Sequence, residues 1–525
     1  MDLKKAFSAD NIFFFGLLLL AASLPLSPYF MSIAQFVISL AWLLSADFEL
    51  KFRKVIANKA ILLLCGIYML HLLGVLWSED YSYAMKDLRV KLPLLLLPFL
   101  IGTYDRISLH RYRIVLTVFV EAVLIATVLC TLVLLNIIKR PIHDIRDISI
   151  FISPIRFGLE ICLAIVLIGY WLYKKYSEIS FWQKMLAVLS ILWLFVFMLL
   201  LETLTGIIVL LLLLLGLLLY NGFKAWNVKL RVVVIIIALG IPALIGWYIK
   251  RSYYEIVTAR SYRYEALHTA QGNLYEPFLS LDDLENGYPV WAYICTKELE
   301  TEWRKRSTIP FNGKDARGQN IESTLIRFLT SKGLKKDAEG VKALSNKDVL
   351  AVEQGYTNVK FQNITDIGAR VHAVLWEING YMRGGDPSGH SVAQRLEYWK
   401  TAISIFKNHP FIGVGTGDIN NAFQEQYDED ESLLSPRWRL KTHNQYLTFA
   451  AVFGIIGFVY CIYALFWPVF QRKYNKNYYY VMFFIIAALS MFTEDTLETQ
   501  AGVTFFAFFS SLFLFQKPDE DDYDM

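Results

Sequence analysis

The chain has 525 residues, of which 55% are hydrophobic and only 19% charged, with a formal net charge of +4. A soluble globular chain averages about 25% charged residues, so this deficit excludes an ordinary soluble enzyme and indicates a membrane protein. The small net charge gives no reason to expect nucleic acid as a partner. Of the five cysteines only Cys295 lies in a long polar segment, and no Cys/His cluster indicates a metal site.

Twelve apolar stretches have a length near the roughly 20 residues that a helix needs to cross a bilayer. They cover residues 11–28, 30–46, 58–77, 91–103, 113–136, 157–173, 185–201, 204–221, 231–249, 445–470, 479–494 and 499–516. The first resembles a signal peptide, but we interpret it as an uncleaved span because many spans follow. The stretch 91–103 is the weakest, being short and containing Pro93 and Pro98. The sequence predicts an all-α polytopic membrane protein with about twelve transmembrane helices.

Lysine and arginine are concentrated in the short loops on one side of these spans. This asymmetry predicts that both termini are cytoplasmic and that the long segment between spans nine and ten faces outward. The predicted organisation is membrane helices one to nine in 1–249, a large, mostly helical insert in 250–443, helices ten to twelve in 444–516, and an acidic cytoplasmic tail in 517–525. An insert of this length exceeds a connecting loop and is expected to form a small domain.

Some basic residues run against this rule, because they lie in outward loops. They occur in WSEDYSYAMKDLRVKLP and in IIKRPIHDIRDISIFISPIRFGLE, the second of which contains Arg156. One interpretation is ordinary anchoring at the membrane interface, and the other is contact with a polyanionic ligand such as a lipid-linked diphosphate. Arg156 and Glu160 are four residues apart, so they share a helix face, either as a charge pair at the helix end or as a ligand-facing pair.

The stretch from Ser391 to Phe458 concentrates polar residues before a long apolar span. Ser391 is a good N-cap for a helix that Pro410 ends, and Arg395 lies one turn before Trp399 at the edge of the apolar stripe. A guanidinium there either forks a phosphate or covers apolar surface with its stem. The glycine run GVGTGD at 413–418 follows a helix rather than a strand, which favours a tight turn with close backbone approach over a nucleotide loop.

His443 lies at the predicted outer mouth of span ten, in the sequence RWRLKTHNQYL. Three cations precede it within six residues: Arg437, Arg439 and Lys441. A neutral imidazole takes a proton from an acceptor hydroxyl, whereas a lone histidine at a helix mouth is more often a capping or interfacial residue. The accompanying arginines favour the role of general base.

The pattern R-x-x-x-W, then P-x-x-G-x-G-x-G, then H-N-x-Y-L before a glycine-containing span resembles the O-antigen ligase and O-antigen polymerase superfamily. Its members transfer lipid-linked glycans. In this chain the pattern comprises Arg395, Trp399, Pro410, Gly413, Gly415, Gly417, His443, Asn444, Tyr446 and Leu447. The region 260–360 and the segment TEDTLETQAG resemble a subgroup seen in Bacteroidetes-like members. The fold implied is that of type C glycosyltransferases, with twelve spans and an outward insert.

The resemblance implies transfer of a glycan from an undecaprenyl diphosphate carrier to an acceptor hydroxyl at the periplasmic face of the bacterial inner membrane, without cofactor, metal or nucleic acid. His443 would be the base and Arg395 would bind the diphosphate. The family usually has a second arginine where this chain has Leu204, so Arg156 is the expected substitute, with Arg437 and Arg439 as weaker ones. Supporting or acceptor-side roles would fall to Asn444, Trp399, Gly415 and Glu160.

The motif leaves three activities open. Ligation of O-antigen to lipid A-core is the leading expectation, and a repeat-unit polymerase or a protein O-oligosaccharyltransferase uses the same parts. The large insert favours a macromolecular acceptor and therefore ligation or protein transfer. A transporter of the same lipid-linked sugar would need broken segments at matching midplane positions in two halves, a pairing that the predicted spans lack.

Overall fold

The structure is a computed structural model that describes residues 8–142, 145–224, 228–258, 267–277, 283–362 and 367–517. Within these ranges regular structure is helical, apart from a short hairpin of β1 (Leu284–Glu285) and β2 (Tyr288–Pro289). The protein is thus an all-α polytopic membrane protein, as predicted. The predicted acidic tail lies outside the described residues from position 518 onward. The chain divides into two compact units, Met1–Lys224 with Arg395–Met525, and Ala225–Gln394.

A helix occupies each of the twelve predicted spans. They are α2 (Ala9–Leu26), α3 (Pro28–Leu44), α5 (Lys59–Leu73), α7 (Pro93–Thr103), α8 (Leu109–Leu134), α9 (Pro154–Lys175), α10 (Phe181–Leu200), α11 (Leu204–Lys224), α12 (Val228–Val257), α20 (Gln445–Phe470), α22 (Tyr478–Ser490) and α23 (Gln500–Phe515). Seven helices of the described chain are long and apolar enough to cross a membrane, or eight if α3 and the helix α4 (Phe48–Ala57), bent by 114°, form one span. Several others, such as α7, α22 and α23, are shorter. The number twelve therefore stays a prediction.

Polar caps explain where many of these helices begin. A serine or asparagine side chain accepts a hydrogen bond from a backbone N–H of the first turn, which satisfies a group that the helix itself leaves without a partner. The N-caps with such a bond include Ser8, Ser27, Asn58, Ser108, Ser180 and Asn477. Each stands just before an apolar run, so the sequence marks these helix starts locally.

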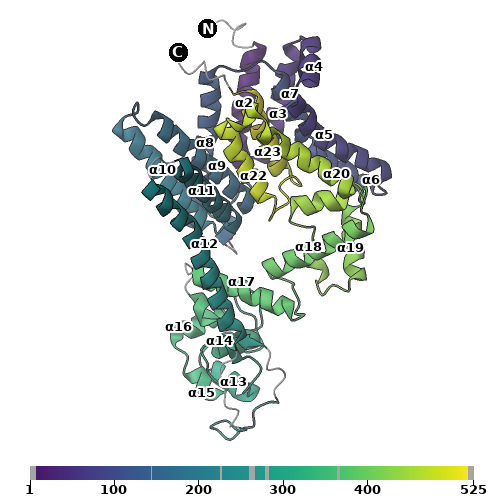
Figure 1. The fold of residues 1–525 in the computed structure, drawn as a ribbon. Helices are drawn as coiled ribbons and strands as arrows, with labels where there is room; N and C mark the ends of the chain where they lie inside the picture. The colour runs from purple at the N-terminus through teal and green to yellow at the C-terminus, as the bar shows by residue number, and fades with distance from the viewer. Residues whose placement is uncertain are drawn as a thin grey trace. The chain divides into compact units, whose positions relative to one another are not determined.

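The C-terminal helix α23 forms the centre of the first unit. Its side chains are buried from Gly502 to Phe515, and it packs against α7 and α22, with further contacts to α2 and α3. Figure 1 shows α23, in yellow, among the purple N-terminal helices, while α22 packs between α23 and the teal helices α9 and α11. The loop between α22 and α23 is thereby held against the N-terminal part of the chain.

The glycine run GVGTGD inserts into a break in α20. At Gly454 the backbone leaves the helical conformation, with φ 61° and ψ −164°. Segment 410–415 supplies four backbone hydrogen bonds there: Val414 N to Ala451 O, Gly415 N to Val452 O, Ile455 N to Pro410 O and Ile456 N to Phe411 O, at 2.8–3.3 Å. A Cβ on Gly413 would lie 2.3 Å from the carbonyl carbon of Val452. The predicted tight turn with close backbone approach is confirmed.

The second unit has a core of its own, which includes Trp303, Phe328 and Leu329. Its helices are α12, α13 (Thr296–Trp303), α14 (Ile321–Ser331), α15 (Ala338–Lys342), α16 (Asn346–Glu353) and α17 (Ile367–Met382), with a 3-10 turn at Val359–Gln362. Helices α12 and α17 pack on each other. The second unit is therefore compact and mostly helical.

The structure divides the chain at other positions than the predicted 250 and 443. Helix α12 groups with the insert because it packs on α17. Residues 395–443, which include most of α18 (Ser391–Asn408) and all of α19 (Ile419–Glu429), group with the membrane helices. The reason is that their side chains bond to the loop between α22 and α23, as the ion pair of Arg395 with Glu494 shows. The sequence prediction assigned residues 395–443 to the insert because these residues are polar.

Candidate active site

The short segment 441–444, just before α20, carries the predicted base. Asn444 caps α20, because its Oδ1 accepts hydrogen bonds from the backbone of Tyr446 at 3.0 Å and Leu447 at 3.1 Å. Its Nδ2 donates to the carbonyl of Phe492 at 3.0 Å. Asn444 is thus a structural residue that ties the start of α20 to the end of α22.

Asp495, in the loop between α22 and α23, holds this segment in place. Its carboxylate accepts four hydrogen bonds: from Thr442 Oγ1 (2.8 Å), His443 N (2.9 Å), Asn444 N (3.1 Å) and Thr448 Oγ1 (2.8 Å). His443 adopts a left-handed backbone with φ 48°, which a non-glycine residue rarely does unless its surroundings enforce it. The bond from its backbone N–H to Asp495 provides that constraint. The orientation of the histidine is therefore built into the loop pairing.

Glu494 joins the predicted base to the predicted phosphate-binding arginine. Its Oε1 lies 2.9 Å from Arg395 Nη2, and its Oε2 lies 3.5 Å from His443 Nδ1. The Glu494 side chain is only 7% exposed, whereas Arg395 is 27% and His443 35% exposed, so the two partners reach solvent and the carboxylate does not. Burial opposes ionisation of Glu494, but the nearby His443 imidazole and Arg395 guanidinium outweigh it and lower the pKa of Glu494. The carboxylate is accordingly charged at neutral pH.

Tyr398, one turn after Arg395 on α18, packs on the imidazole. The two ring centroids are 5.7 Å apart with planes inclined by 28°, and the Tyr398 hydroxyl donates to the carbonyl of Trp438 at 2.7 Å. The imidazole of His443 is held between this ring and Glu494. Sequence reasoning found α18 but not the role of its tyrosine.

Arg156, at the start of α9, reaches the same loop. Its Nη1 donates to Ser153 Oγ at 3.2 Å and its Nη2 to the carbonyl of Asp495 at 3.5 Å. The start of α11 also lies beside α9 and this loop. A Cβ on Gly158 of α9 would lie 2.9 Å from Thr203 Oγ1. Thr205 Oγ1 of α11 is 3.5 Å from Thr493 Oγ1 of the loop. Arg156 thus lies beside the segment that contains Leu204, where the family resemblance placed an arginine.

Glu160, the expected partner of Arg156, is buried in α9 with 1% exposure. Its Oε2 has no hydrogen-bond partner within the described ranges, and the bonds of Arg156 go to Ser153 and Asp495 instead. The two residues share a helix face, but the charge pair considered from their spacing is not formed in this structure.

The remaining predicted residues have local structural contacts. Arg439 donates to the carbonyl of Leu434 at 3.1 Å and pairs with Asp428 at 2.5 Å. Arg437 is exposed and stacks over Trp438. Trp399 packs, partly buried, on the membrane core. Gly415, with φ 90°, leaves no room for a side chain beside Ser78, since an added Cβ would lie 2.7 Å from the Ser78 hydroxyl.

A second charge cluster, which sequence reasoning missed as a unit, continues from the first. Glu498 pairs with Lys441 at 3.1 Å and with Lys91 at 2.8 Å, and Lys91 also pairs with Asp87 at 2.7 Å. Asp87 and Lys91 belong to α6 (Tyr81–Lys91), and Asp87 lies 3.5 Å from His71 of α5. Burial raises the pKa of Glu498, but its two lysines outweigh this and lower it. The cluster fastens Lys441, two residues before His443, to α6.

The missed residues had a signal in the sequence. Three carboxylates, Glu494, Asp495 and Glu498, stand within TEDTLET between two apolar helices, where charge is costly unless it is paired or functional. Every one of them pairs with the segment KTHN or its neighbours, so an acidic loop faces a basic one. An imidazole with a buried carboxylate 3.5 Å from one nitrogen, and an arginine on the same carboxylate, suits proton abstraction next to an anion.

Residues 349–462 match the protein-family model described as O-Antigen ligase. The matched region contains Arg395, His443 and the first part of α20, and it includes the pattern on which the resemblance was identified. No curated protein matches the chain.

Proposed function

We propose that this chain, whose residues 349–462 match the O-Antigen ligase family model, transfers a glycan from undecaprenyl diphosphate to an acceptor hydroxyl. The proposed location is the periplasmic face of the bacterial inner membrane, and the proposed reaction is ligation of O-antigen to lipid A-core. The observation that carries the proposal is that the Glu494 carboxylate lies within ion-pair distance of both His443 and Arg395.

In the proposed reaction His443 is the general base. Because Nδ1 faces the Glu494 carboxylate, Nε2 is the nitrogen left to take the proton of the acceptor hydroxyl. The hydroxyl oxygen then forms a bond to the anomeric carbon of the donor sugar, and the bond from that carbon to the phosphate oxygen breaks. The electron pair leaves with the diphosphate, and the imidazolium is stabilised by Glu494. No metal ion takes part in this scheme.

Arg395 and Arg156 are the proposed binding groups for the diphosphate. Before the donor arrives, Arg395 is paired with Glu494. A diphosphate carries more charge than one carboxylate and accepts a guanidinium fork, so it competes for Arg395. This exchange would leave Glu494 to His443 alone, at the step in which the imidazole becomes charged. Arg156 would replace the second arginine that the family usually has at the position of Leu204.

The compact second unit supports a large acceptor, because a domain of this size is more than a connection between two spans. We therefore place ligation ahead of repeat-unit polymerisation. Protein O-glycosylation shares the same chemistry and differs only in the acceptor.

The experiment that tests the function is a deletion strain whose surface glycans are separated on a gel. Loss of all long chains from lipopolysaccharide, with lipid-linked polymer accumulating, is the result expected for a ligase. A single repeat unit on the core would identify a polymerase instead, and normal lipopolysaccharide with shortened glycoproteins a protein transferase. Unchanged lipopolysaccharide and glycoproteins would contradict glycan transfer altogether.

A further inference from the structure

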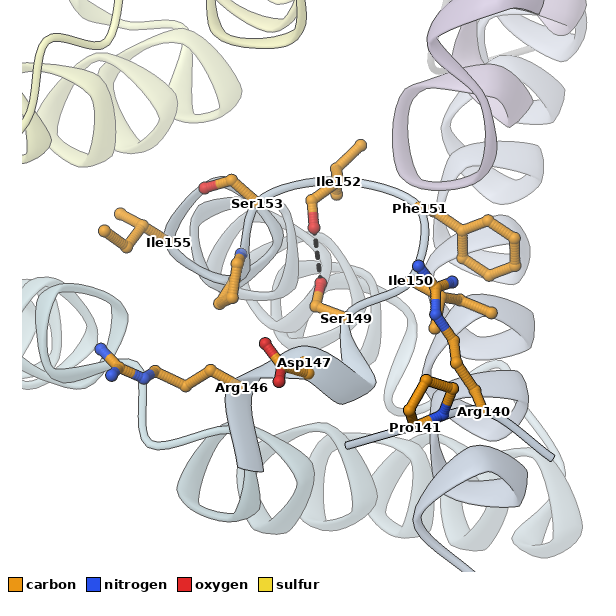
Figure 2. A pocket seen from close by; sticks show the side chains of 11 residues that line it. Arg140, Pro141, Arg146, Asp147, Ser149, Ile150, Phe151, Ile152, Ser153 and Ile155 are labelled. Atoms are coloured by element: carbon orange, nitrogen blue, oxygen red, sulfur yellow. Dashed lines mark hydrogen bonds between the residues drawn. The ribbon is translucent and has the colours of Figure 1, made fainter. Parts of the chain in front are cut away.

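The connection between α8 and α9 forms a pocket with a volume of about 750 Å³, within the range of about 300–1,000 Å³ that small-molecule sites have. Figure 2 shows the side chains arranged around the hollow. Its lining consists of Arg140, Pro141, Arg146, Asp147, Ser149, Ile150, Phe151, Ile152, Ser153, Pro154 and Ile155. None of these residues has a role in the reaction proposed above.

The pocket wall is anchored to the membrane unit. Ile148 and Ile152 are 0% and 7% exposed and belong to the core of that unit. Between them Ser149 Oγ donates to the carbonyl of Ile152 at 2.7 Å, which closes the turn and is drawn as the dashed line in Figure 2. Two buried anchors and a closed turn make the hollow a preformed feature of the connection.

The lining combines charged, hydroxyl-bearing and apolar side chains. The guanidinium groups of Arg140 and Arg146 extend toward opposite sides of the hollow, and Asp147 lies between them (Figure 2). Phe151 and the isoleucines supply apolar surface, and Ser149 and Ser153 supply hydroxyls. Such a set suits a sugar, whose ring has apolar faces and a polar rim. The described lining carries two guanidinium groups and one carboxylate, which favours a sugar with a negative charge.

Two hydrogen bonds of Arg156 connect the pocket to the candidate active site. Ser153, in the pocket wall, accepts from Arg156 Nη1 at 3.2 Å, and Arg156 Nη2 donates to the carbonyl of Asp495, whose carboxylate holds His443. The pocket therefore adjoins the side of the site where the proposed function places the diphosphate. The sugars of a donor are attached to that diphosphate and must lie next to it.

We propose that this pocket is a subsite for the donor saccharide and selects sugars that carry a carboxylate. The identification of the ligand as the donor saccharide rests on the proposed function, whereas the preference for an acidic sugar rests on the pocket lining alone. The two arginines lie at opposite sides of the hollow, which suits acidic groups on separate sugars better than a single diphosphate. Arg395 and Arg156 already serve the diphosphate in the scheme above.

The test measures binding to the purified full chain in nanodiscs, with tri-galacturonate, the neutral maltotriose and inorganic pyrophosphate as probes. The pocket variant is Arg140→Gln with Arg146→Gln. The control variant is Lys86→Gln with Arg89→Gln, which removes the same charge from two exposed residues of α6, in another predicted outward loop and outside the pocket. Wild type should bind tri-galacturonate at least tenfold more tightly than maltotriose.

The pocket variant should lose about tenfold or more in tri-galacturonate affinity, while the control variant keeps it and both keep pyrophosphate binding. Equal binding of the acidic and neutral trisaccharides by wild type would overturn the proposal, as would an unchanged pocket variant. Parallel loss of pyrophosphate binding in the pocket variant would assign the arginines to the diphosphate and also overturn it. Binding needs no transfer, so these results are independent of whether the proposed function holds.

Discussion

The Glu494 carboxylate contacts two residues of the candidate site. One of its oxygens pairs with Arg395 and the other faces His443. In a buried position a carboxylate of this kind orients an imidazole and stabilises it once it is protonated. In the proposed reaction the stabilisation appears only as the proton moves. The side chain is therefore expected to affect the rate more than the binding of donor.

Replacement of Glu494 by glutamine keeps the shape and an acceptor oxygen but removes the charge. We expect the rate of transfer to fall about 100-fold or more at unchanged protein level, with a smaller effect on the donor concentration needed for half-maximal rate. Transfer by the purified variant measures this. Glu429→Gln, on the exposed part of α19, removes the same charge elsewhere and should leave the rate unchanged. A rate for Glu494→Gln equal to wild type would show that the carboxylate has no part in transfer.

Glu494 also makes stability depend on pH. Its pKa is lowered in the folded chain, so its contribution to the free energy of unfolding is complete above the pKa of an unfolded glutamate, about 4.3. The contribution is lost as the pH falls through the lower folded value. Melting of wild type and Glu494→Gln in detergent should therefore differ at neutral pH and converge in acid. A difference that grows toward acid would give the opposite sign.

At the residue scale the sequence pointed to His443 and Arg395 as candidates, because His443 follows three cations at a predicted span mouth and both residues lie in the family pattern. Their roles stay predictions. The sequence did not identify their partners. Glu494 and Asp495 follow His443 by more than fifty residues, with two membrane helices between them, and a pairing across that distance depends on how α20, α22 and α23 pack. The sequence around TEDTLET does not predict which basic segment this loop faces.

At the scale of elements, α20 differs most from its prediction. The apolar run 445–470 was expected to form one continuous span, and it is broken at Gly454 because segment 410–415 bonds into it. The break brings the end of α18 against α20, while the start of α18 carries Arg395. A run of apolar residues shows no sign of such an insertion, although the positive φ of Gly413 and Gly454 explains why glycine is needed there.

Gly413→Ala should therefore destabilise the chain by about 3 kcal/mol or more, through a strained backbone and a Cβ 2.3 Å from the Val452 carbonyl carbon. Gly454→Ala should do the same, with its Cβ 2.3 Å from the Phe411 carbonyl carbon. The matched control is Gly216→Ala on α11, where an added Cβ meets no atom within 4 Å. Thermal melting in detergent distinguishes them, and equal melting of all three variants would exclude a role for the close approach.

At the scale of the whole molecule, the composition and the distribution of apolar stretches predicted a membrane protein with a separate helical insert. Both predictions depend on the average hydrophobicity of long segments rather than on single contacts. Unit boundaries depend on particular contacts. Helix α12 reads as the ninth span from its apolar run, yet it packs on α17 of the insert. Residues 395–443 look like the end of the insert because they are polar, yet their contacts are with the membrane helices.

The predicted orientation gives a test at this scale. All five cysteines are buried or half-buried, so a new exposed cysteine should be labelled over a low background. Lys347→Cys, on exposed α16 of the insert, should react with a membrane-impermeant maleimide added to spheroplasts. Lys473→Cys, at an exposed position of the short helix α21 (Arg472–Asn475) between α20 and α22, should react only after permeabilisation. The reverse pattern would invert the orientation and place the site on the cytoplasmic side.

The central claim is that His443 is the base of a glycan transfer, and the direct measurement is transfer by the purified chain reconstituted with membranes from a strain that lacks it. His443→Ala should reduce the rate by a factor of about 10²–10⁴ or more while the protein still inserts and melts normally. His409→Ala, an exposed histidine at the end of α18, should transfer like wild type. Full transfer by His443→Ala would contradict the account.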